Sequence, residues 1–362
     1  MTGSHQPKIT GLNVSAIRLP MLEPHRTASG VVSESPLVLT ELYTDTGITG
    51  RSIVFTYTPV ALKPLADLIS NMSTLVENQS LAPTQLEAQL SGRFRLLGTQ
   101  GLIGMALAAI DMALWDAHTR VHQTNLVQLL GGTAKAVPVY GGIGYDGEHG
   151  SATSAEIWAK RGFRGVKAKI GYPDVSEDLK VIRAIRDSVG PDIAVMVDYN
   201  QCLSPIKAIE RVKHLNDAGL TWIEEPTLAH DYSGHAAIRA QSDTPIQSGE
   251  NWWGTLDLQH ALDNNASDFV MLDVMKVGGV SGWLRGASMA ASKNIPVSSH
   301  LWPEISSQLL SVTPTAHWVE YCDWWNSLLI EPLQVKNGFS TLSDSIGTGM
   351  DWRDDIAEQY RI

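Results

Sequence analysis

The chain has 362 residues, of which 43% are hydrophobic, enough for one large domain with a smaller partner or for two ordinary domains. Its formal net charge of −11 argues against binding to nucleic acid or to anionic membranes. The two cysteines, Cys202 and Cys322, are too few for a disulfide framework and fit a reducing compartment. We see neither a signal peptide nor an apolar run long enough to span a bilayer, so we expect a soluble, cytoplasmic protein.

The N-terminal region combines strand and helix patterns. Residues 9–20 and 36–55 read as antiparallel strands, with a turn around Asp45-Thr46-Gly47. Helical patterns follow at about 60–76, 83–95 and 102–122. We therefore expect an α+β capping domain over residues 1–133.

Residues 134–327 alternate short apolar runs with longer segments of helical period. Ser176 and Gly190 are the expected ends of one helix, and Ser204-Pro205 and Gly219 the expected ends of another. Strand–helix units repeated eight times are what a parallel barrel needs. A doubly wound open sheet is the alternative, but it normally has a glycine-rich turn after its first strand, and only a weak GGVSG occurs late in the pattern. The eight candidate strands are 136–142, 165–170, 193–199, 221–225, 245–250, 269–273, 295–300 and 317–321.

The alternation stops after Glu320. Residues 328–342 read as strand and turn. We see no low-complexity linker before them, so the C-terminal segment, residues 328–362, is expected to pack back on the capping domain.

Ionisable residues occur where the candidate strands end. In a parallel barrel these ends surround one mouth, where the active site is built. Acidic residues also cap strand ends for purely structural reasons, but so many in register favour convergence on one site. The residues are Asp198, Glu224, Glu225, Glu250, Asp273, His300 and Glu320.

Three of the carboxylates lie on successive strands and would repel one another if they met without a cation. Magnesium suits three protein carboxylates that leave positions open for water and substrate. Zinc is disfavoured, because the pattern offers neither cysteine nor a closely spaced histidine pair. We expect Mg²⁺, with Mn²⁺ as a substitute, on Asp198, Glu224 and Glu250.

Two possible bases flank this site. Lys167 and Lys169 lie two residues apart on one strand and so share a face, where burial and like charge would lower a lysine pKa. An exposed edge strand with solvated lysines is the alternative. Asp273 and His300 end neighbouring strands, and a carboxylate bonded to one imidazole nitrogen would raise the basicity of the other.

The chain resembles the mandelate racemase group of the enolase superfamily over nearly its whole length. The motifs that carry the resemblance are VKAKIGYP, VDYNQ, TWIEEPTLAHDYSGH, GENWW, LDVMKVGGVSGW, SSHLWPEIS and TPTAHWVE. It implies a modified (β/α)7β barrel, with a cap formed by the N-terminal region and the C-terminal tail. It also implies a homo-oligomer and a small-molecule carboxylate substrate.

The resemblance further implies a role for each site residue. Asp198, Glu224 and Glu250 would bind Mg²⁺. Lys169 would be the base for one enantiomer, and His300, oriented by Asp273, the base for the other. Lys167 would neutralise the substrate carboxylate, Glu320, if protonated, would hydrogen-bond the developing enediolate, and Asn200 would lie near the α-oxygen.

The substrate pocket departs from the family pattern. In residues 25–32, His25 and Ser29 stand where branched apolar side chains are expected. Cys322 and Gly142 replace an apolar residue and a serine that contacts the substrate. Phe55, Tyr57 and Leu96 keep the aromatic and apolar character, so we expect a mixed pocket that includes Tyr57 and His25.

Three hypotheses of function remain open. The first is a racemase of mandelate or a related 2-hydroxyacid. The second is a sugar-acid dehydratase, which would suit His25, Arg26 and Ser29. The third is a non-catalytic metal-binding or ligand-binding barrel, which leaves both bases unexplained.

Overall fold

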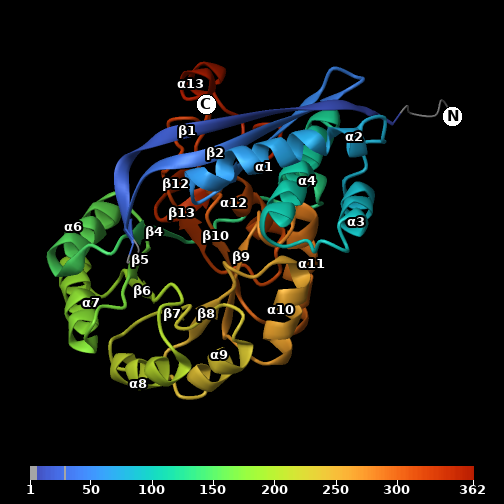
Figure 1. Ribbon diagram of the computed structural model, residues 1–362. Helices are drawn as coiled ribbons and strands as arrows, with labels where there is room; N and C mark the ends of the chain where they lie inside the picture. Colours follow the sequence, from blue (N-terminus) through green and yellow to red (C-terminus); the bar gives the residue numbers. More distant parts are fainter. Residues whose placement is uncertain (1–5, 28–29) are drawn as a thin grey trace.

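A three-stranded antiparallel sheet opens the computed structural model, which describes residues 6–27 and 30–362. Its strands are β1 (Ile9–Thr27), β2 (Gly30–Thr44) and β3 (Thr49–Phe55). The predicted strands and the turn at residues 45–47 are confirmed, and the strands extend further than predicted. Together β1 and β2 form a long ribbon that crosses the molecule and descends toward β4 and β5 (Figure 1).

Five helices follow the sheet, and α4 is buried on nearly all sides. It packs between β3 and a helix of the barrel, α11 (Gly279–Ser292). The helix expected at 60–76 is divided at Met72 into α1 and α2, a difference from our prediction. The five are α1 (Pro59–Asn71), α2 (Ser73–Val76), α3 (Pro83–Arg93), α4 (Gly101–Val121) and α5 (Leu126–Leu129).

Eight parallel strands and seven intervening helices form a (β/α)7β barrel, as expected. Hydrogen bonds between β10 and the residues before β11, such as His317 N to Val297 O at 2.8 Å, bring the outer strands together. Each observed strand overlaps its predicted range. The strands are β4 (Val139–Ile143), β5 (Gly165–Lys169), β6 (Ala194–Asp198), β7 (Ile223–Glu224), β8 (Ile246–Ser248), β9 (Phe269–Asp273), β10 (Val297–His300) and β11 (Val319–Tyr321).

The barrel helices begin and end mostly where the sequence indicates. Ser204 caps α8 and Gly190 ends α7, as predicted. The N-cap of α7 is Asp174 and not Ser176, because its carboxylate accepts from the Ser176 amide within a capping box. Helix α8 ends at Leu215, four residues before Gly219. The helices are α6 (Gly147–Lys160), α7 (Val175–Val189), α8 (Pro205–Leu215), α9 (Tyr232–Arg239), α10 (Gly254–Asp263), α11 (Gly279–Ser292) and α12 (Pro303–Val312).

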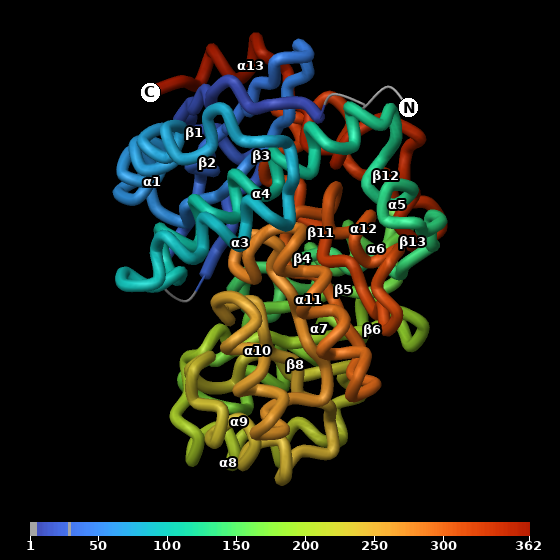
Figure 2. Tube along the Cα trace, turned by 90° about the vertical axis from the view of Figure 1, so that its right-hand side faces the viewer, coloured from blue at the N-terminus to red at the C-terminus, as the bar shows by residue number. Residues whose placement is uncertain are grey.

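The end of the C-terminal segment returns to the N-terminal sheet, while its hairpin lies against the start of β4. The segment contains β12 (Gln334–Lys336), β13 (Phe339–Thr341) and a helix that was not predicted, α13 (Asp354–Gln359). Its last residues run beside β1, where the Arg18 amide donates to the Tyr360 carbonyl at 3.0 Å. Figure 2 shows α13 beside β1 and β2 at one end of the molecule, with the barrel below.

The ribbon of β1 and β2 lies against the mouth of the barrel. The Tyr145 amide, just past β4, donates to the Arg26 carbonyl at 2.9 Å, and Arg26 pairs with Asp146 at 3.8 Å. The capping sheet therefore supplies side chains to the same space as the strand ends. Ser29, which we expected to face the substrate, lies outside the described residues.

Two findings bear on the state of the cysteines and on the expectation of no segment that spans a bilayer. Cys202 and Cys322 are both free, as expected for a chain without a disulfide framework. In the part of the chain that the structure describes, every helix is too short or too polar to cross a bilayer.

Asp116 on α4 ties the cap to the C-terminal segment. Its buried carboxylate accepts from the Arg51 amide at 2.8 Å, from the Thr348 amide at 2.8 Å and from Arg120 Nε at 2.7 Å. Arg120 also donates to Asp351 at 2.7 Å. Burial raises the pKa of Asp116 even though Arg120 opposes the shift.

We predict that Asp116→Ala lowers the free energy of unfolding by about 3 kcal/mol, because it leaves the amides of Arg51 and Thr348 without their acceptor and the partly buried Arg120 guanidinium with Asp351 alone. Urea unfolding measures the change. Asp67→Ala is the control, because Asp67 forms an exposed pair with Lys63 and its loss costs less than about 1 kcal/mol. Equal losses in the two variants would contradict this role of Asp116.

Candidate active site

The ionisable strand-end residues meet at one edge of the barrel. Parallel register places Lys169 beside Asp198, Asp198 beside Glu224, and Asp273 beside His300. Each of these side chains is buried except that of Lys169, which is 17% exposed. The predicted convergence is therefore present in the structure.

Three carboxylates form the centre of the site. Asp198, Glu224 and Glu250 each offer an oxygen within 4.8 Å of the others. Glu224 Oε2 is oriented by Trp222 Nε1 at 2.9 Å and Gln247 Nε2 at 3.0 Å. Glu250 Oε2 is buried and has no hydrogen-bond partner in the described structure. A buried carboxylate oxygen without a donor, beside two further carboxylates, fits a hard dication with oxygen ligands.

The two lysines point at this triad. Lys167 Nζ lies 2.8 Å from Glu320 Oε1 and also donates to Glu224, while Lys169 donates to Asp198. Lys167 is buried in the barrel interior and Lys169 is largely enclosed at its mouth, so the exposed-edge alternative is wrong.

The direction of the lysine pKa values differs from our expectation. Burial lowers the pKa of each, but the Glu224 and Glu320 carboxylates outweigh it at Lys167, and Asp198 does so at Lys169. With only the charges of the protein itself considered, the pKa values of both lysines therefore lie above the ordinary value for lysine. The prediction considered burial and like charge and omitted the surrounding carboxylates.

His300 and Asp273 form the expected pair. His300 Nδ1 lies 2.6 Å from Asp273 Oδ2, while Asp273 Oδ1 accepts from the amides of Met275 at 2.8 Å and Lys276 at 2.9 Å. The other imidazole nitrogen, Nε2, lies 3.5 Å from Glu250 Oε2. Burial lowers the pKa of His300, but the Glu250 and Glu320 carboxylates outweigh burial, so the pKa of His300 is raised.

Glu320 joins the two sides of the site. Its Oε1 contacts Lys167, and its Oε2 accepts from the Leu301 amide at 2.8 Å and lies 3.8 Å from His300 Nε2. Burial raises the pKa of Glu320, but Lys167 and His300 lower it by more. With only the charges of the protein itself considered, Glu320 is therefore ionised near neutrality, in contrast to the protonated form that we considered.

The predicted substrate contacts border the same space. Asn200 has a φ of 48° and places its Nδ2 3.4 Å from Glu250 Oε1. Tyr57 reaches in from the cap, with its ring centroid 4.8 Å from that of Phe55. Tyr57 stays 40% exposed at this edge of the pocket.

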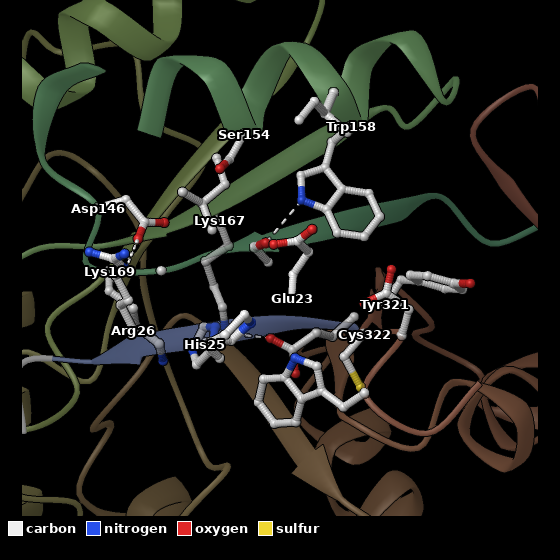
Figure 3. Close-up of a pocket in the computed structure, with 18 of the residues that line it drawn as sticks. Glu23, His25, Arg26, Asp146, Ser154, Trp158, Lys167, Lys169, Tyr321 and Cys322 are labelled. Carbon is white, nitrogen blue, oxygen red and sulfur yellow. Dashed lines mark hydrogen bonds and ion pairs between the residues drawn. The ribbon is translucent and has the colours of Figure 1, made fainter. Parts of the chain in front are cut away.

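Two connected hollows lie between the cap and the barrel mouth. The polar lobe has a volume of about 220 Å³ and is lined by Gly142, Asp146, Ser154, Trp158 and Cys322, among others (Figure 3). The aromatic lobe has about 300 Å³ and is lined by residues that include Val32, Phe55, Tyr57 and Asn200. Both lobes share His25, Lys169, His300, Leu301 and Trp324.

The pocket is mixed, as expected, but one of its predicted residues is misplaced. Leu96 is 99% exposed and lines neither lobe, because it lies in the loop between α3 and α4. Its apolar character alone gave no indication of this position.

Several residues at the site were not predicted. Lys276 donates to Asn251 Oδ1 at 2.6 Å and lies 4.6 Å from the centre of the Tyr57 ring, while Asn251 donates to Glu225 at 2.7 Å. Trp324 forms a wall of both lobes. Lys276 and Asn251 are the last residues of the strand-end motifs LDVMK and GEN, so their sequence neighbours could have indicated them.

Two family models match the chain, one in its N-terminal region and one in the barrel and C-terminal segment. Residues 10–131 match the N-terminal domain of the mandelate racemase / muconate lactonizing enzyme family. Residues 151–356 match the enolase C-terminal domain-like family.

Individual relatives agree on the family and differ in activity. A solved enolase from Bradyrhizobium, complexed with magnesium and mandelic acid, is 42% identical, covers both chains in full and superposes with a TM-score of 0.95. L-talarate/galactarate dehydratase of Salmonella typhimurium is 33% identical over 73% of this chain and 66% of its own length. D-galactarolactone cycloisomerase of Agrobacterium fabrum is 28% identical over 97% of this chain and 99% of its own.

Magnesium is bound in several solved relatives, and this chain has the buried acidic triad that suits it. The fold, the strand-end constellation and both family matches lead to the same assignment. The chain belongs to the mandelate racemase group of the enolase superfamily.

Proposed function

We propose that this enzyme removes the α-proton of a 2-hydroxycarboxylate and returns a proton to the same carbon, racemising mandelate or a related 2-hydroxyacid through an enediolate. The observation that carries the proposal is the pair of possible bases. Lys169, on β5, and His300, on β10, both line the two lobes, and the carboxylate triad lies beside them. A carbon held between these nitrogens could lose a proton to one and gain a proton from the other.

The α-proton is difficult to remove because the product carries a second negative charge on an already ionised carboxylate. Lys167, buried and charged beside Glu320, is placed to bind one carboxylate oxygen of the substrate. Magnesium at Asp198, Glu224 and Glu250 would stabilise the added charge and neutralise the carboxylates that raise the lysine pKa values. We assign Asn200 to the α-hydroxyl, because its amide reaches Glu250 beside the triad.

The two bases serve opposite enantiomers in this proposal. Lys169 takes the proton of one, while His300 takes the proton of the other. Asp273 keeps the proton of His300 on Nδ1, which leaves Nε2 free to face the substrate. Glu320 lies between Lys167 and His300, where a proton passed to it would allow it to donate to the enediolate oxygen.

Dehydration is the second candidate. The same Lys169 could take the α-proton while His300 protonates a departing β-hydroxyl, which leaves as water and gives a 2-keto-3-deoxy acid. The side chains of Asp146 and Ser154 in the polar lobe support this reading, as does the similarity to L-talarate/galactarate dehydratase. Mandelic acid bound in the 42% identical structure supports the racemase.

Homo-oligomerisation, a cytoplasmic location and replacement of Mg²⁺ by Mn²⁺ stay predictions.

We predict that Lys169→Ala and His300→Asn each abolish racemisation, while each variant still exchanges the α-proton of one enantiomer in D₂O. The reason is that each variant retains the base on one face only. Proton NMR of both enantiomers of the substrate, with Mg²⁺ present, measures the exchange.

Glu156→Gln is the control, because Glu156 forms an exposed pair with Lys160 on α6. Exchange of both enantiomers by either base variant would refute the two-base assignment. Formation of a 2-keto acid by the unaltered enzyme would support the dehydratase instead.

Removal of Mg²⁺ with a chelator should abolish α-proton exchange, and added Mg²⁺ should restore it. We further predict that Glu250→Gln weakens Mg²⁺ binding at least about tenfold, because it replaces the carboxylate whose buried oxygen lacks a donor. Calorimetric titration with Mg²⁺ measures this without any substrate. Unchanged affinity would show that the cation is held elsewhere.

A further inference from the structure

A buried carboxylate that the proposed chemistry does not use holds the chain just after Lys169. Asp178 is in the first turn of α7, and its side chain is fully buried. Its Oδ1 accepts from the amides of Gly171 and Tyr172, both at 2.9 Å. These amides belong to the second and third residues after Lys169, the last residue of β5. The carboxylate therefore fixes the point at which the chain leaves the strand that carries one proposed base.

The chain turns sharply at this point. Gly171 has a φ of 106°, in the region that favours glycine, and a Cβ on it would lie 2.6 Å from Cys202 Sγ. Directly before the turn, the Ile170 amide donates to the Asp198 carbonyl at 2.9 Å. Lys169 precedes this segment, so the conformation of the turn determines where the backbone of the lysine lies. The reach of its side chain into the site depends on the same turn.

The second oxygen of Asp178 ties the neighbouring strand to the same place. Asp178 Oδ2 accepts from the hydroxyl of Tyr199 at 3.1 Å, and Tyr199 directly follows Asp198, the last residue of β6. Arg211, on α8, donates to the same oxygen at 2.6 Å. It also donates to two carbonyls of the loop after β5, at 2.8 and 2.9 Å. One carboxylate thus holds the ends of β5 and β6 together.

The second proposed base, His300, is held by a separate set of contacts. Asp273, on β9, lies 2.6 Å from its Nδ1 and accepts in turn from two amides of the loop that follows β9. Among the residues that the structure describes, these contacts share none with those of Asp178. Loosening the contacts of Asp178 should therefore displace Lys169 and leave His300 in place.

We propose that Asp178 is a positioning residue for Lys169, because it holds the turn after β5 in the conformation from which the lysine reaches the α-carbon. This inference rests on the proposed two-base reaction. A displacement of about 1 Å at a reacting group can lower a rate about 100-fold. The loss should concern only the enantiomer whose proton Lys169 removes, whereas a general loosening of the fold would impair both enantiomers alike.

The test measures α-proton exchange in D₂O, at saturating Mg²⁺, in variants that retain one base each. The probes are the enantiomers of mandelate and pairs of aldonates that differ only at the α-carbon. In the His300→Asn background, where Lys169 is the remaining base, adding Asp178→Asn should lower exchange about 10- to 100-fold. The asparagine keeps the size of the side chain, but its NH₂ group cannot accept from Arg211 or Tyr199. In the Lys169→Ala background, the same substitution should change exchange less than about threefold.

Two further variants keep the test decisive. Asp187→Asn is the matched control, because Asp187 is on the same helix and exposed, and it should leave exchange unchanged in both backgrounds. Tyr199→Phe removes one hydrogen bond to Asp178 and keeps the buried charge, so it should lower Lys169-dependent exchange by a smaller factor, about fivefold. It replaces Asp178→Asn in the test if circular dichroism shows that the latter is not folded.

Equal losses in the two single-base backgrounds would overturn the positioning role of Asp178. Unchanged exchange in both, or a loss confined to the background that retains His300, would overturn it too. Each of these results leaves the proposed function standing. The proposed function itself fails if the unaltered enzyme exchanges none of the probes, or if either single-base variant exchanges both configurations of a probe.

Discussion

Like charge confined at the mouth of the barrel is the constraint on which this site depends. Asp198, Glu224 and Glu250 are buried within 4.8 Å of one another, and burial, with the neighbouring carboxylates, raises the pKa of Glu224. Lys167 and Lys169 offset part of this charge through direct hydrogen bonds. A dication would neutralise the remaining negative charge, so the lysines would no longer be needed to offset it and could contact the substrate. Metal binding and base strength are therefore coupled in one cluster.

The fold keeps this cluster in place by distributing it over rigid strands. Lys169, Asp198 and Glu224 are register partners on three adjacent strands, so their separation is set by backbone hydrogen bonds. The opposite base, His300, is fixed by Asp273 on the neighbouring strand. The rest of the lining of the two lobes comes in part from the cap, as with His25 and Tyr57, and from loops such as the one that carries Trp324.

Sequence periodicity predicted the parallel strands and the residues at their ends, because each strand end in a barrel leads to the same mouth. It could not place Leu96, since nothing in an apolar loop residue indicates whether the loop turns inward, and the side chain is exposed. It also missed the direction of the lysine pKa values, which depends on how close Glu320 and Glu224 come. The place of Lys276 in the motif LDVMK indicates that it lies near the site, but its contact with the Tyr57 ring could not be predicted, because the two residues are far apart in sequence.

In the proposed reaction, one carbon of the substrate lies between two bases beside one metal ion. A crystal structure with Mg²⁺ and a non-reacting analogue of a 2-hydroxyacid tests it most directly. We predict the ion on Asp198, Glu224 and Glu250, and the α-carbon about 3–3.5 Å from both Lys169 Nζ and His300 Nε2. An α-carbon that approaches only one of these nitrogens, or an ion held by other residues, would contradict the account.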